Sequence, residues 1–325
     1  MPLIDRFGRE HTYLRVSVTD RCNLRCTYCM PADGVTWRPR SEILSLEEIH
    51  RVCRIAVSAG ITKIRLTGGE PTVRQNLIEL VQRLAALPGL KTLAMTTNGV
   101  TLAAQVAALH QAGLRSLNIS LDTLRPQRFR EITLHDRLHD VLRGIDAALD
   151  IGFSPLKLNV VVLAGINDDE PADFIEFIRH RPLNVRFIEF MPFPGNPWQE
   201  NRYVPSRTIH AALSRQYNLV PAGSNSGVAR DYRISGIAGT VSFIAPLTDE
   251  FCASCNRLRL TADGAVKSCL LYPAELSLRD ALRSGAADAD IAALIRNALA
   301  HKERSHPPEC ALPHLENRCM TNIGG

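Results

Sequence analysis

Short apolar runs alternate with amphipathic stretches between residues 11 and about 215, and this alternation constrains the fold of the chain most. The runs that predict strands are YLRVSV (13–18), KIRLT (63–67), TLAMTT (92–97), SLNISLD (116–122), KLNVVVL (157–163) and VRFIEF (185–190). The clearest helical stretch begins with a capping box at Ser45 and Glu48 and ends at Gly60. Strands that alternate with helices predict a parallel sheet covered by helices. Because six units fall short of the eight in a closed barrel, we expect an α/β fold with an open, partial TIM-like (βα)6 barrel and an active face at the C-terminal strand ends.

Composition limits the classes of protein that this chain can belong to. Its 325 residues are 45% hydrophobic, which suffices for one large domain or a domain with an appendage. It has no run of ~18 apolar residues and begins without an apolar signal region, so we expect a cytoplasmic protein with no membrane partner. That compartment also suits nine cysteines that must stay reduced. The net charge of +5 permits a polyanionic small molecule, whereas the lack of a long basic run disfavours nucleic acid.

Three cysteines lie within eight positions of the segment CNLRCTYC, namely Cys22, Cys26 and Cys29. In a reduced protein, this density indicates a metal site rather than disulfides. A cubane iron-sulfur cluster normally takes four cysteines, so three would leave one iron free to bind another molecule. The residues alone also allow a zinc site with a fourth ligand.

Four cations lie in or beside strands that a parallel sheet would bury: Arg15, Arg65, Lys157 and Arg186. Because an unpaired buried cation costs several kcal/mol, they predict an anionic occupant at the barrel mouth, such as a phosphate-rich ligand. The alternative is that each pairs with a helix carboxylate or extends outward to solvent.

Small and polar residues follow three of the predicted strands. They form the segments TGGEP (67–71), TTNG (96–99) and SLD (120–122). Adjacent glycines at a strand end let the backbone approach a ligand closely. Each segment alone is compatible with an ordinary turn.

The pattern changes at about residue 216, where turn residues mix with short alternating runs. We therefore divide the chain into a barrel, residues 1–215, and an antiparallel and helical C-terminal region, residues 216–325. A second three-cysteine set, Cys252, Cys255 and Cys269, spans a predicted hairpin that turns at Asp263–Gly264. We favour a second iron-sulfur cluster, with zinc and unligated thiols as alternatives, because a Cys3His zinc site lacks a histidine between His210 and His301.

The first cysteine spacing, with Tyr28 before the last cysteine, resembles the cluster loop of radical S-adenosylmethionine (SAM) enzymes. The two cysteine sets together with CNRLRLT and a terminal Ile-Gly-Gly resemble the GTP 3′,8-cyclase family of molybdenum cofactor biosynthesis, and this resemblance extends from Arg15 to Gly325. It implies a lyase with two 4Fe-4S clusters and SAM as cofactors. In that family, an adenosyl radical removes hydrogen from the ribose 3′ carbon of GTP, and the substrate radical attacks carbon 8 of guanine. The product is (8S)-3′,8-cyclo-7,8-dihydroguanosine 5′-triphosphate, and the second cluster binds the guanine.

The resemblance also assigns residues. It implies that Cys22, Cys26 and Cys29 hold the first cluster and that Cys252, Cys255 and Cys269 hold the second. It places Tyr28, Gly69, Ser120 and Met191 at SAM. It places Arg15, Arg65, Thr96, Lys157, Arg257, Leu258 and Arg259 at GTP. Arg186 is our addition from the strand pattern, and Arg257 and Arg259 share one strand face because they alternate.

Further expectations concern the chain end, the partners and the remaining cysteines. In the family, a double glycine equivalent to Gly324 and Gly325 inserts toward the active site, which a tip without side chains permits. The resemblance implies an electron donor such as flavodoxin or ferredoxin, a downstream cyclic pyranopterin monophosphate synthase and a homodimer. Cys53 is expected in the core, and Cys310 and Cys319 match no family pattern.

Two other classes compete with this interpretation. One is a different radical enzyme with an auxiliary cluster, such as a peptide maturase or an RNA-modifying enzyme, which usually carries more C-terminal cysteines or an added module. The other is a non-catalytic iron-sulfur or zinc scaffold, which would not explain the glycine segment or the strand-end cations.

Overall fold

The structure is a computed structural model that describes residues 2–31, 34–154, 156–193, 196, 202–223, 227–249, 251–274, 276–307 and 317–324. Its strands form one sheet in the order β12-β11-β10-β1-β2-β3-β4-β5-β6-β9-β8-β7. The strands are β1 (Tyr13–Ser17), β2 (Lys63–Thr67), β3 (Thr92–Thr97), β4 (Ser116–Ser120), β5 (Leu156–Val162), β6 (Leu183–Glu189), β7 (Leu219–Pro221), β8 (Ala229–Ile234), β9 (Thr240–Ile244), β10 (Arg257–Leu260), β11 (Ala265–Lys267) and β12 (Leu276–Ser277).

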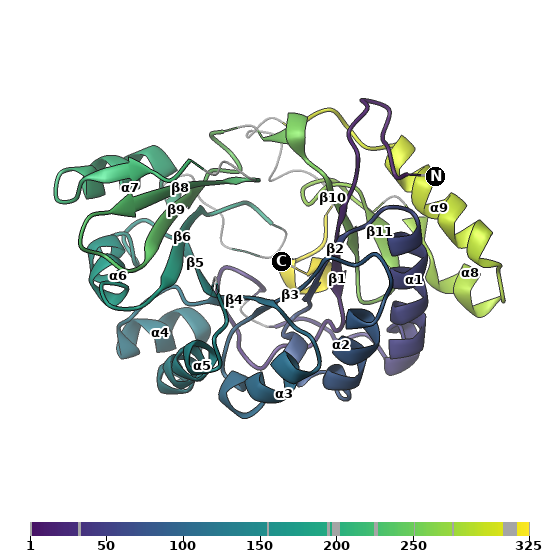
Figure 1. Ribbon diagram of the computed structural model, residues 1–325, viewed down its shortest axis with the longest axis horizontal. Coiled ribbons are helices and arrows are strands. Elements are labelled where there is room, and N and C mark those ends of the chain that lie inside the picture. Colours follow the sequence, from purple (N-terminus) through teal and green to yellow (C-terminus); the bar gives the residue numbers. More distant parts are fainter. Residues whose placement is uncertain are drawn as a thin grey trace.

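Helices cover the convex side of this curved sheet, as Figure 1 shows. The α-helices are α1 (Leu46–Ser58), α2 (Leu77–Ala85), α3 (Val106–Gln111), α4 (Pro126–Thr133), α5 (Leu138–Asp150), α6 (Pro171–Phe177), α7 (Ser206–Ser214), α8 (Arg279–Arg283), α9 (Asp288–Ala300) and α10 (Met320–Ile323). Short 3-10 helices are η1 (Arg40–Glu42), η2 (Pro71–Val73), η3 (Leu102–Ala104) and η5 (Cys252–Ser254). The predicted capping box is confirmed, because the Ser45 side chain accepts from the Glu48 amide at 3.1 Å and the Glu48 carboxylate accepts from the Ser45 amide at 2.7 Å.

The predicted open barrel is confirmed by the strand pairing. Strands β1 to β6 pair in parallel and in sequence order. Strand β10 adds in parallel to β1, and β9 adds in parallel to β6. Only the outer strands are antiparallel, β11 and β12 at one edge and β8 and β7 at the other. Residues beyond 216 thus extend both edges of the sheet that the first part of the chain builds.

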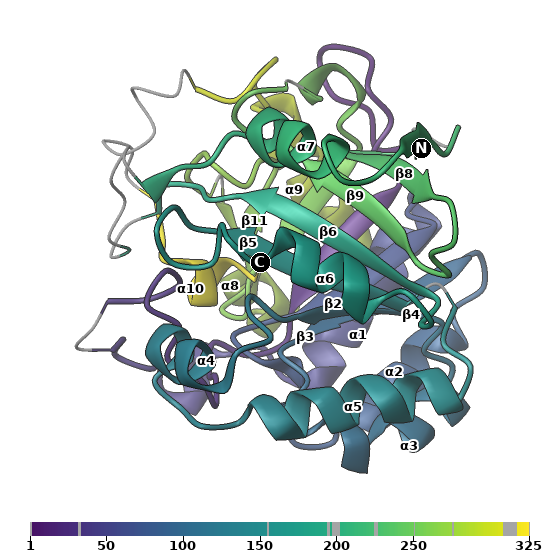
Figure 2. The same ribbon diagram turned by 90° about the vertical axis from the view of Figure 1, so that its left-hand side faces the viewer.

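The main core lies between the sheet and its helices. It includes Ile49, Val52 and Cys53 of α1, so Cys53 is a buried core residue as expected. A smaller cluster joins Phe193, Leu247, Leu271 and Ile323. Figure 2 shows the short helix α10, which carries Ile323, close to the C-terminal end of the described chain. This cluster therefore anchors the last residues against the rest of the protein.

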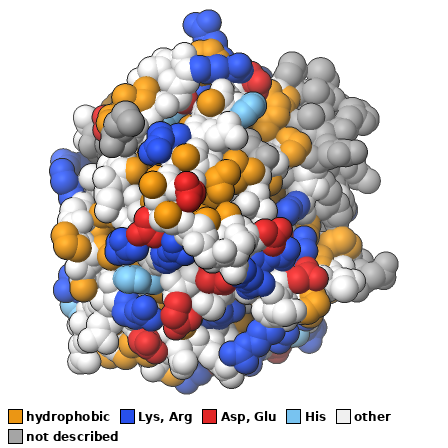
Figure 3. Space-filling view, turned by 90° about the vertical axis from the view of Figure 1, so that its right-hand side faces the viewer, with side chains coloured by type: hydrophobic (Ala, Val, Ile, Leu, Met, Phe, Trp, Pro, Cys, Tyr) orange, Lys and Arg blue, Asp and Glu red, His pale blue; other side chains and the backbone are white. Residues whose placement is uncertain are grey.

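The face that carries α1, α8 and α9 has acidic and basic side chains interspersed (Figure 3). Opposite charges pair there between elements far apart in sequence, as in Arg51 with Asp288 at 2.8 Å and Arg283 with Glu48 at 2.8 Å. Across the described residues, we find no helix with the length and apolar character needed to cross a bilayer.

Candidate active site

A cavity of about 1020 Å³ lies on the concave side of the sheet. Many of the residues singled out from sequence line it. They are Arg15, Cys22, Cys26, Tyr28, Cys29, Arg65, Gly69, Thr96, Ser120, Lys157, Arg186, Met191, Arg257 and Arg259. The open barrel therefore brings the first cysteine set and the strand-end cations to a single space.

The first cysteine set occupies the loop after β1. Cys22 Sγ accepts a hydrogen bond from the Leu24 amide at 3.4 Å and from the Asn98 side chain at 3.7 Å. Burial raises the pKa of Cys22 to about 11 and that of Cys26 well above its ordinary value. These thiols would therefore bind a metal with release of their protons.

The arrangement of donors bears on the kind of metal. Among the described residues, no three histidine, cysteine or carboxylate side chains converge on a point that a single metal ion could occupy. Cysteines that hold a cubane cluster bind different irons and need not converge. Amide donors to sulfur, as at Cys22, are also typical of cluster environments. The first set thus fits a cluster better than a lone zinc ion.

The glycine segment after β2 packs directly against this loop. The Gly69 amide donates to the Thr19 carbonyl at 2.8 Å. A Cβ at Gly69 would lie 2.4 Å from the Arg21 carbonyl oxygen and 2.5 Å from that of Asp20. Only glycine can occupy this position without moving the backbone that leads into Cys22.

Glu70 ties two of the three predicted strand-end segments together. Its buried carboxylate accepts from the Thr72 amide at 3.0 Å, the Thr97 hydroxyl at 2.6 Å and the Asn98 amide at 2.6 Å. Asn98 in turn contacts Cys22. Residues 67–71 and 96–99 therefore support the same cysteine, which single-segment reasoning could not establish.

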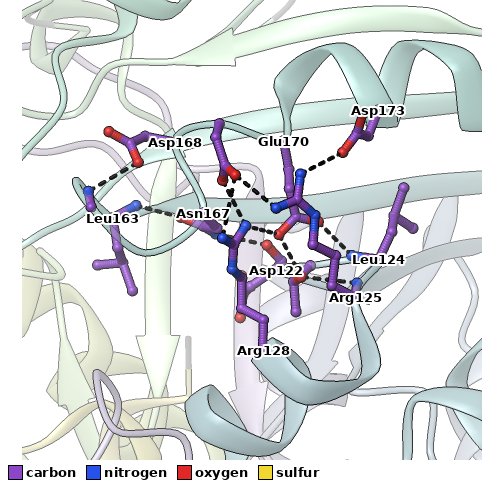
Figure 4. Close-up of polar contacts among 12 residues, drawn as sticks. Asp122, Leu124, Arg125, Arg128, Leu163, Asn167, Asp168, Glu170 and Asp173 are labelled. Carbon is purple, nitrogen blue, oxygen red and sulfur yellow. Dashed lines mark hydrogen bonds and ion pairs between the residues drawn. The ribbon is translucent and has the colours of Figure 1, made fainter.

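A second polar network fixes the end of β4 (Figure 4). Asp122 accepts from the Tyr28 hydroxyl at 2.7 Å and from the Val161 amide at 2.9 Å. Asn167 donates to the Asp122 carbonyl at 2.7 Å, and the buried Glu170 accepts from the Leu124 amide at 2.8 Å. The segment that follows Ser120 is thereby held next to the cysteine loop.

Three arginines lie side by side on neighbouring strands. Arg259 of β10 pairs in register with Arg15 of β1, which pairs in register with Arg65 of β2. Arg65 and Arg259 are only 3% and 5% exposed. No described carboxylate forms an ion pair with Arg65, Lys157 or Arg259. Pairing with helix carboxylates, the alternative raised from sequence, thus does not account for these three cations.

Tyr13 lies among these cations and was missed from sequence. Its hydroxyl accepts from Arg65 Nε at 2.7 Å and from Arg15 Nη1 at 3.3 Å, and its ring lies 4.8 Å from Lys63 Nζ. Burial raises the pKa of Tyr13, but the surrounding cations, Arg65 first, outweigh burial and lower this pKa to about 6. The signal was present, because Tyr13 and Lys63 lie two residues before Arg15 and Arg65 and so share their strand faces.

The other side of the cavity is also basic. Burial, and then the charges of Arg186, Arg65 and Lys63, lower the pKa of Lys157 to about 8. Asn118 and Asn159 line the same wall and were also missed. The Asn118 side-chain oxygen is buried and has no hydrogen-bond partner among the residues that the structure describes. This wall can therefore offer polar contacts to a bound molecule.

The second cysteine set flanks the predicted hairpin, which β10 and β11 confirm. Cys252 and Cys255 precede β10, and Cys269 follows β11. Their immediate neighbours Phe251, Asn256 and Leu270 line the cavity. The residue between Arg257 and Arg259, Leu258, points away and packs in the core, so a contact from this position is left to its backbone.

The described chain ends inside the barrel. The Gly324 carbonyl accepts a hydrogen bond from Arg259 Nη1 at 3.0 Å. A Cβ at Gly324 would lie 2.5 Å from Thr67 Oγ1 and 2.8 Å from Ser17 Cβ. The expectations for Gly325 and Cys310 lie outside the described residues.

Comparisons with known proteins agree with this geometry. A family described as "Radical SAM superfamily" matches residues 16–178, and one described as "Molybdenum Cofactor Synthesis C" matches residues 183–308. The chain is 49% identical to "GTP 3′,8-cyclase, mitochondrial" of Arabidopsis thaliana, over 99% of this chain and 83% of the relative. It is 46% identical to "GTP 3′,8-cyclase" of Moorella thermoacetica, over 99% of each.

The fold has a distant solved counterpart. The SAM-bound crystal structure of Streptococcus suis SuiB aligns with a TM-score of 0.61 at 14% identity, over 82% of this chain and 62% of SuiB. At this identity, the likeness concerns the fold alone. The two family matches and the relatives of 46% and 49% identity, which cover 99% of this chain, show its family: the chain belongs to the GTP 3′,8-cyclase family of the radical SAM superfamily.

Proposed function

We propose that this protein is a GTP 3′,8-cyclase that converts GTP to (8S)-3′,8-cyclo-7,8-dihydroguanosine 5′-triphosphate in molybdenum cofactor biosynthesis. One observation carries the proposal: the cavity lined by Cys22, Cys26 and Cys29 is also lined by the buried Arg65 and Arg259, which have no carboxylate partner in the described part of the chain. The source of the radical and a bound polyphosphate would therefore lie in the same cavity. A generic iron-sulfur scaffold would have no need of the cations.

The first cysteine set would hold a 4Fe-4S cluster with one iron open to SAM. When bound, the cluster and SAM supply the 5′-deoxyadenosyl radical that removes the ribose hydrogen. The residues that would orient SAM are Tyr28, Gly69, Ser120 and Met191. The hydrogen bond from Tyr28 to Asp122 fixes the loop position from which Tyr28 would act.

The lysine and arginine side chains of the cavity would bind the triphosphate of GTP. Guanidinium groups match phosphate oxygens in charge and geometry, and the in-register arginines present three of them on adjacent strands. The residues proposed to contact GTP are Arg15, Arg65, Thr96, Lys157, Arg257, Arg259 and the backbone of Leu258, with Arg186 as an addition.

The second cysteine set would hold another 4Fe-4S cluster, with an open iron for the guanine. We keep the division into a barrel, residues 1–215, and a C-terminal region, residues 216–325, as part of this proposal. Gly324 and Gly325 would close the cavity. A cytoplasmic enzyme of this kind needs an electron donor such as flavodoxin or ferredoxin, would pass its product to cyclic pyranopterin monophosphate synthase, and is proposed to form a homodimer.

Anaerobic reconstitution tests these assignments. The proposal predicts about eight irons per chain and GTP-dependent release of 5′-deoxyadenosine together with the cyclised product, both measured by mass spectrometry. About four irons with one zinc would refute the second cluster. Release of 5′-deoxyadenosine that is indifferent to GTP, with a peptide or RNA modified instead, would favour the rival radical enzymes.

A further inference from the structure

One lysine is buried against the second cysteine set. Lys302 follows α9 and is 3% exposed. Its Nζ atom lies 3.6 Å from Cys255 Sγ, 3.1 Å from the Arg257 carbonyl oxygen and 2.6 Å from the Ser268 carbonyl oxygen. Ser268 directly precedes Cys269. A single ammonium group therefore bridges the two arms of the hairpin beside Cys255 and Cys269.

The described residues offer this ammonium no carboxylate partner. Its three hydrogen-bond acceptors are one thiol and two neutral carbonyls. Asp5, on the neighbouring N-terminal segment, is already bound to Arg9 Nε at 2.6 Å. Burial, and then the charge of Lys302, lower the pKa of the adjacent His11 to about 4, so His11 is neutral at physiological pH. A buried cation without a counter-charge is unfavourable, which indicates that an anion belongs beside it.

The two cysteine sets differ in whether a cationic side chain contacts a cysteine sulfur. No lysine or arginine side chain is a hydrogen-bond partner of a sulfur atom among the described contacts of Cys22, Cys26 and Cys29. At the second set, by contrast, Lys302 Nζ lies 3.6 Å from Cys255 Sγ. A buried ammonium therefore contacts a sulfur atom of the second set, whereas the described contacts of the first set include no such cation.

We propose that Lys302 is a positioning residue of the second cysteine site: it supplies the fixed positive charge for an anionic, thiolate-held group, holds Cys255 and Cys269 at their spacing, and raises the reduction potential of that group. The inference rests on the second cluster of the proposed function. Reduction by one electron adds one negative charge to a cluster, so a nearby buried cation favours the reduced state. Removing the cation removes that preference.

The test uses the full-length chain with Cys22, Cys26 and Cys29 replaced by Ala, so that only the second site can hold a cluster. In this parent, Lys302→Met removes the charge, Lys302→Gln keeps a hydrogen-bond donor without charge, and Lys302→Arg keeps the charge. Arg54→Met, on the outer surface of α1 and paired with Asp288, removes a cation far from the site as a control. Iron content, circular dichroism and the midpoint potential by EPR-monitored titration are measured for each.

The proposal predicts that Lys302→Met and Lys302→Gln lower the midpoint potential, whereas Lys302→Arg and Arg54→Met leave it close to the parent value. Loss of iron from the two neutral variants, with circular dichroism unchanged and iron retained in Lys302→Arg, also supports it. Equal potentials and equal iron in all variants would overturn it. A parent without iron would overturn the second cluster and this role of Lys302 together, while cyclisation by the unmodified chain would still stand as a separate result.

Discussion

Arg259 donates a hydrogen bond from Nη1 to the carbonyl oxygen of Gly324, at 3.0 Å, and so joins the C-terminal tail to the row of arginines in the barrel. The same arginine pairs in register with Arg15. The tail therefore ends at the proposed triphosphate site, and changes to either should affect the other.

Gly324→Ala should displace the tail. Gly324 has φ +81 and its added Cβ would meet Thr67 and Ser17 below 3.0 Å. We expect formation of the cyclised product to fall at least about tenfold, the equivalent of roughly 1.4 kcal/mol, while iron content and GTP-independent SAM cleavage persist. Gly285→Ala is the matched control, because Gly285 also has φ +81 but no neighbour within 4 Å. Equal loss of product in both variants would show that backbone strain, and not the tail position, is responsible.

Extending the chain beyond Gly325 by a few residues tests the same site without an internal substitution. Gly324 lies so close to Ser17 and Thr67 that even a Cβ would meet them, so we expect added residues to displace it. We expect turnover to be abolished with cluster content intact, measured by product analysis and iron assay. Full turnover in the extended protein would refute an inserted tail.

Replacing Arg257 and Arg259 by Ala should weaken GTP binding, whereas loss of the Arg259 charge should not lower the stability of the ligand-free protein. Each charged hydrogen bond to phosphate is worth about 1.5–3 kcal/mol, so GTP affinity should fall roughly tenfold or more per residue, as measured by calorimetry. Burial and the neighbouring cations Arg15 and Arg257 lower the pKa of Arg259, which means that its charge is disfavoured in the ligand-free protein. The free energy of unfolding without ligand should therefore not decrease through loss of this charge. Unchanged product formation in the double variant would count against both residues.

Lys157 should make GTP binding dependent on pH. Its pKa is lowered to about 8, so the free protein loses this charge as pH rises through 8, and GTP must then bind together with a proton. Affinity should therefore weaken progressively as the pH rises from 7 to above 8. Lys157→Arg should bind with a flatter profile, because arginine stays charged throughout. Parallel profiles for the two proteins between pH 7 and 9.5 would mean that Lys157 does not contact the anion.

Gly69→Ala should disrupt the first cysteine site rather than the fold as a whole. The new methyl group would collide with the carbonyl oxygens of Asp20 and Arg21, which lead into Cys22. We expect loss of iron from the first site and of SAM cleavage, measured by iron assay and 5′-deoxyadenosine release. Gly152→Ala, at φ +89 with open space around it, should cost only about 1 kcal/mol of stability and keep its iron.

Much of the barrel follows from local patterns in the sequence. The strands Lys63–Thr67 and Thr92–Thr97 match the predicted runs, because a period of two residues and flanking helices define them. The same period correctly placed Arg15, Arg65 and Lys157 in the cavity. A local pattern carries this information because strand geometry alone decides which side chains share a face.

The remaining features depend on contacts between distant segments. Pairing of β10 with β1 joins residues more than two hundred positions apart, and it alone creates the row of arginines. Tyr13 gains its role from cations on other strands, and Lys302 meets Cys255 only through the placement of α9. Lys302 has no unusual sequence neighbourhood, so tertiary structure was needed to find it, whereas Tyr13 shares a strand face with Arg15 and could have been found from the sequence.

The most direct test of the central claim, that one cavity brings SAM-derived radical chemistry to the ribose of GTP, is isotope transfer from GTP deuterated at the ribose 3′ carbon. The reconstituted enzyme is incubated anaerobically with SAM, a reductant and the labelled GTP, and 5′-deoxyadenosine is analysed by mass spectrometry. The account predicts one deuterium in 5′-deoxyadenosine and the cyclised product in matching amount. Unlabelled 5′-deoxyadenosine with no cyclised product would contradict it.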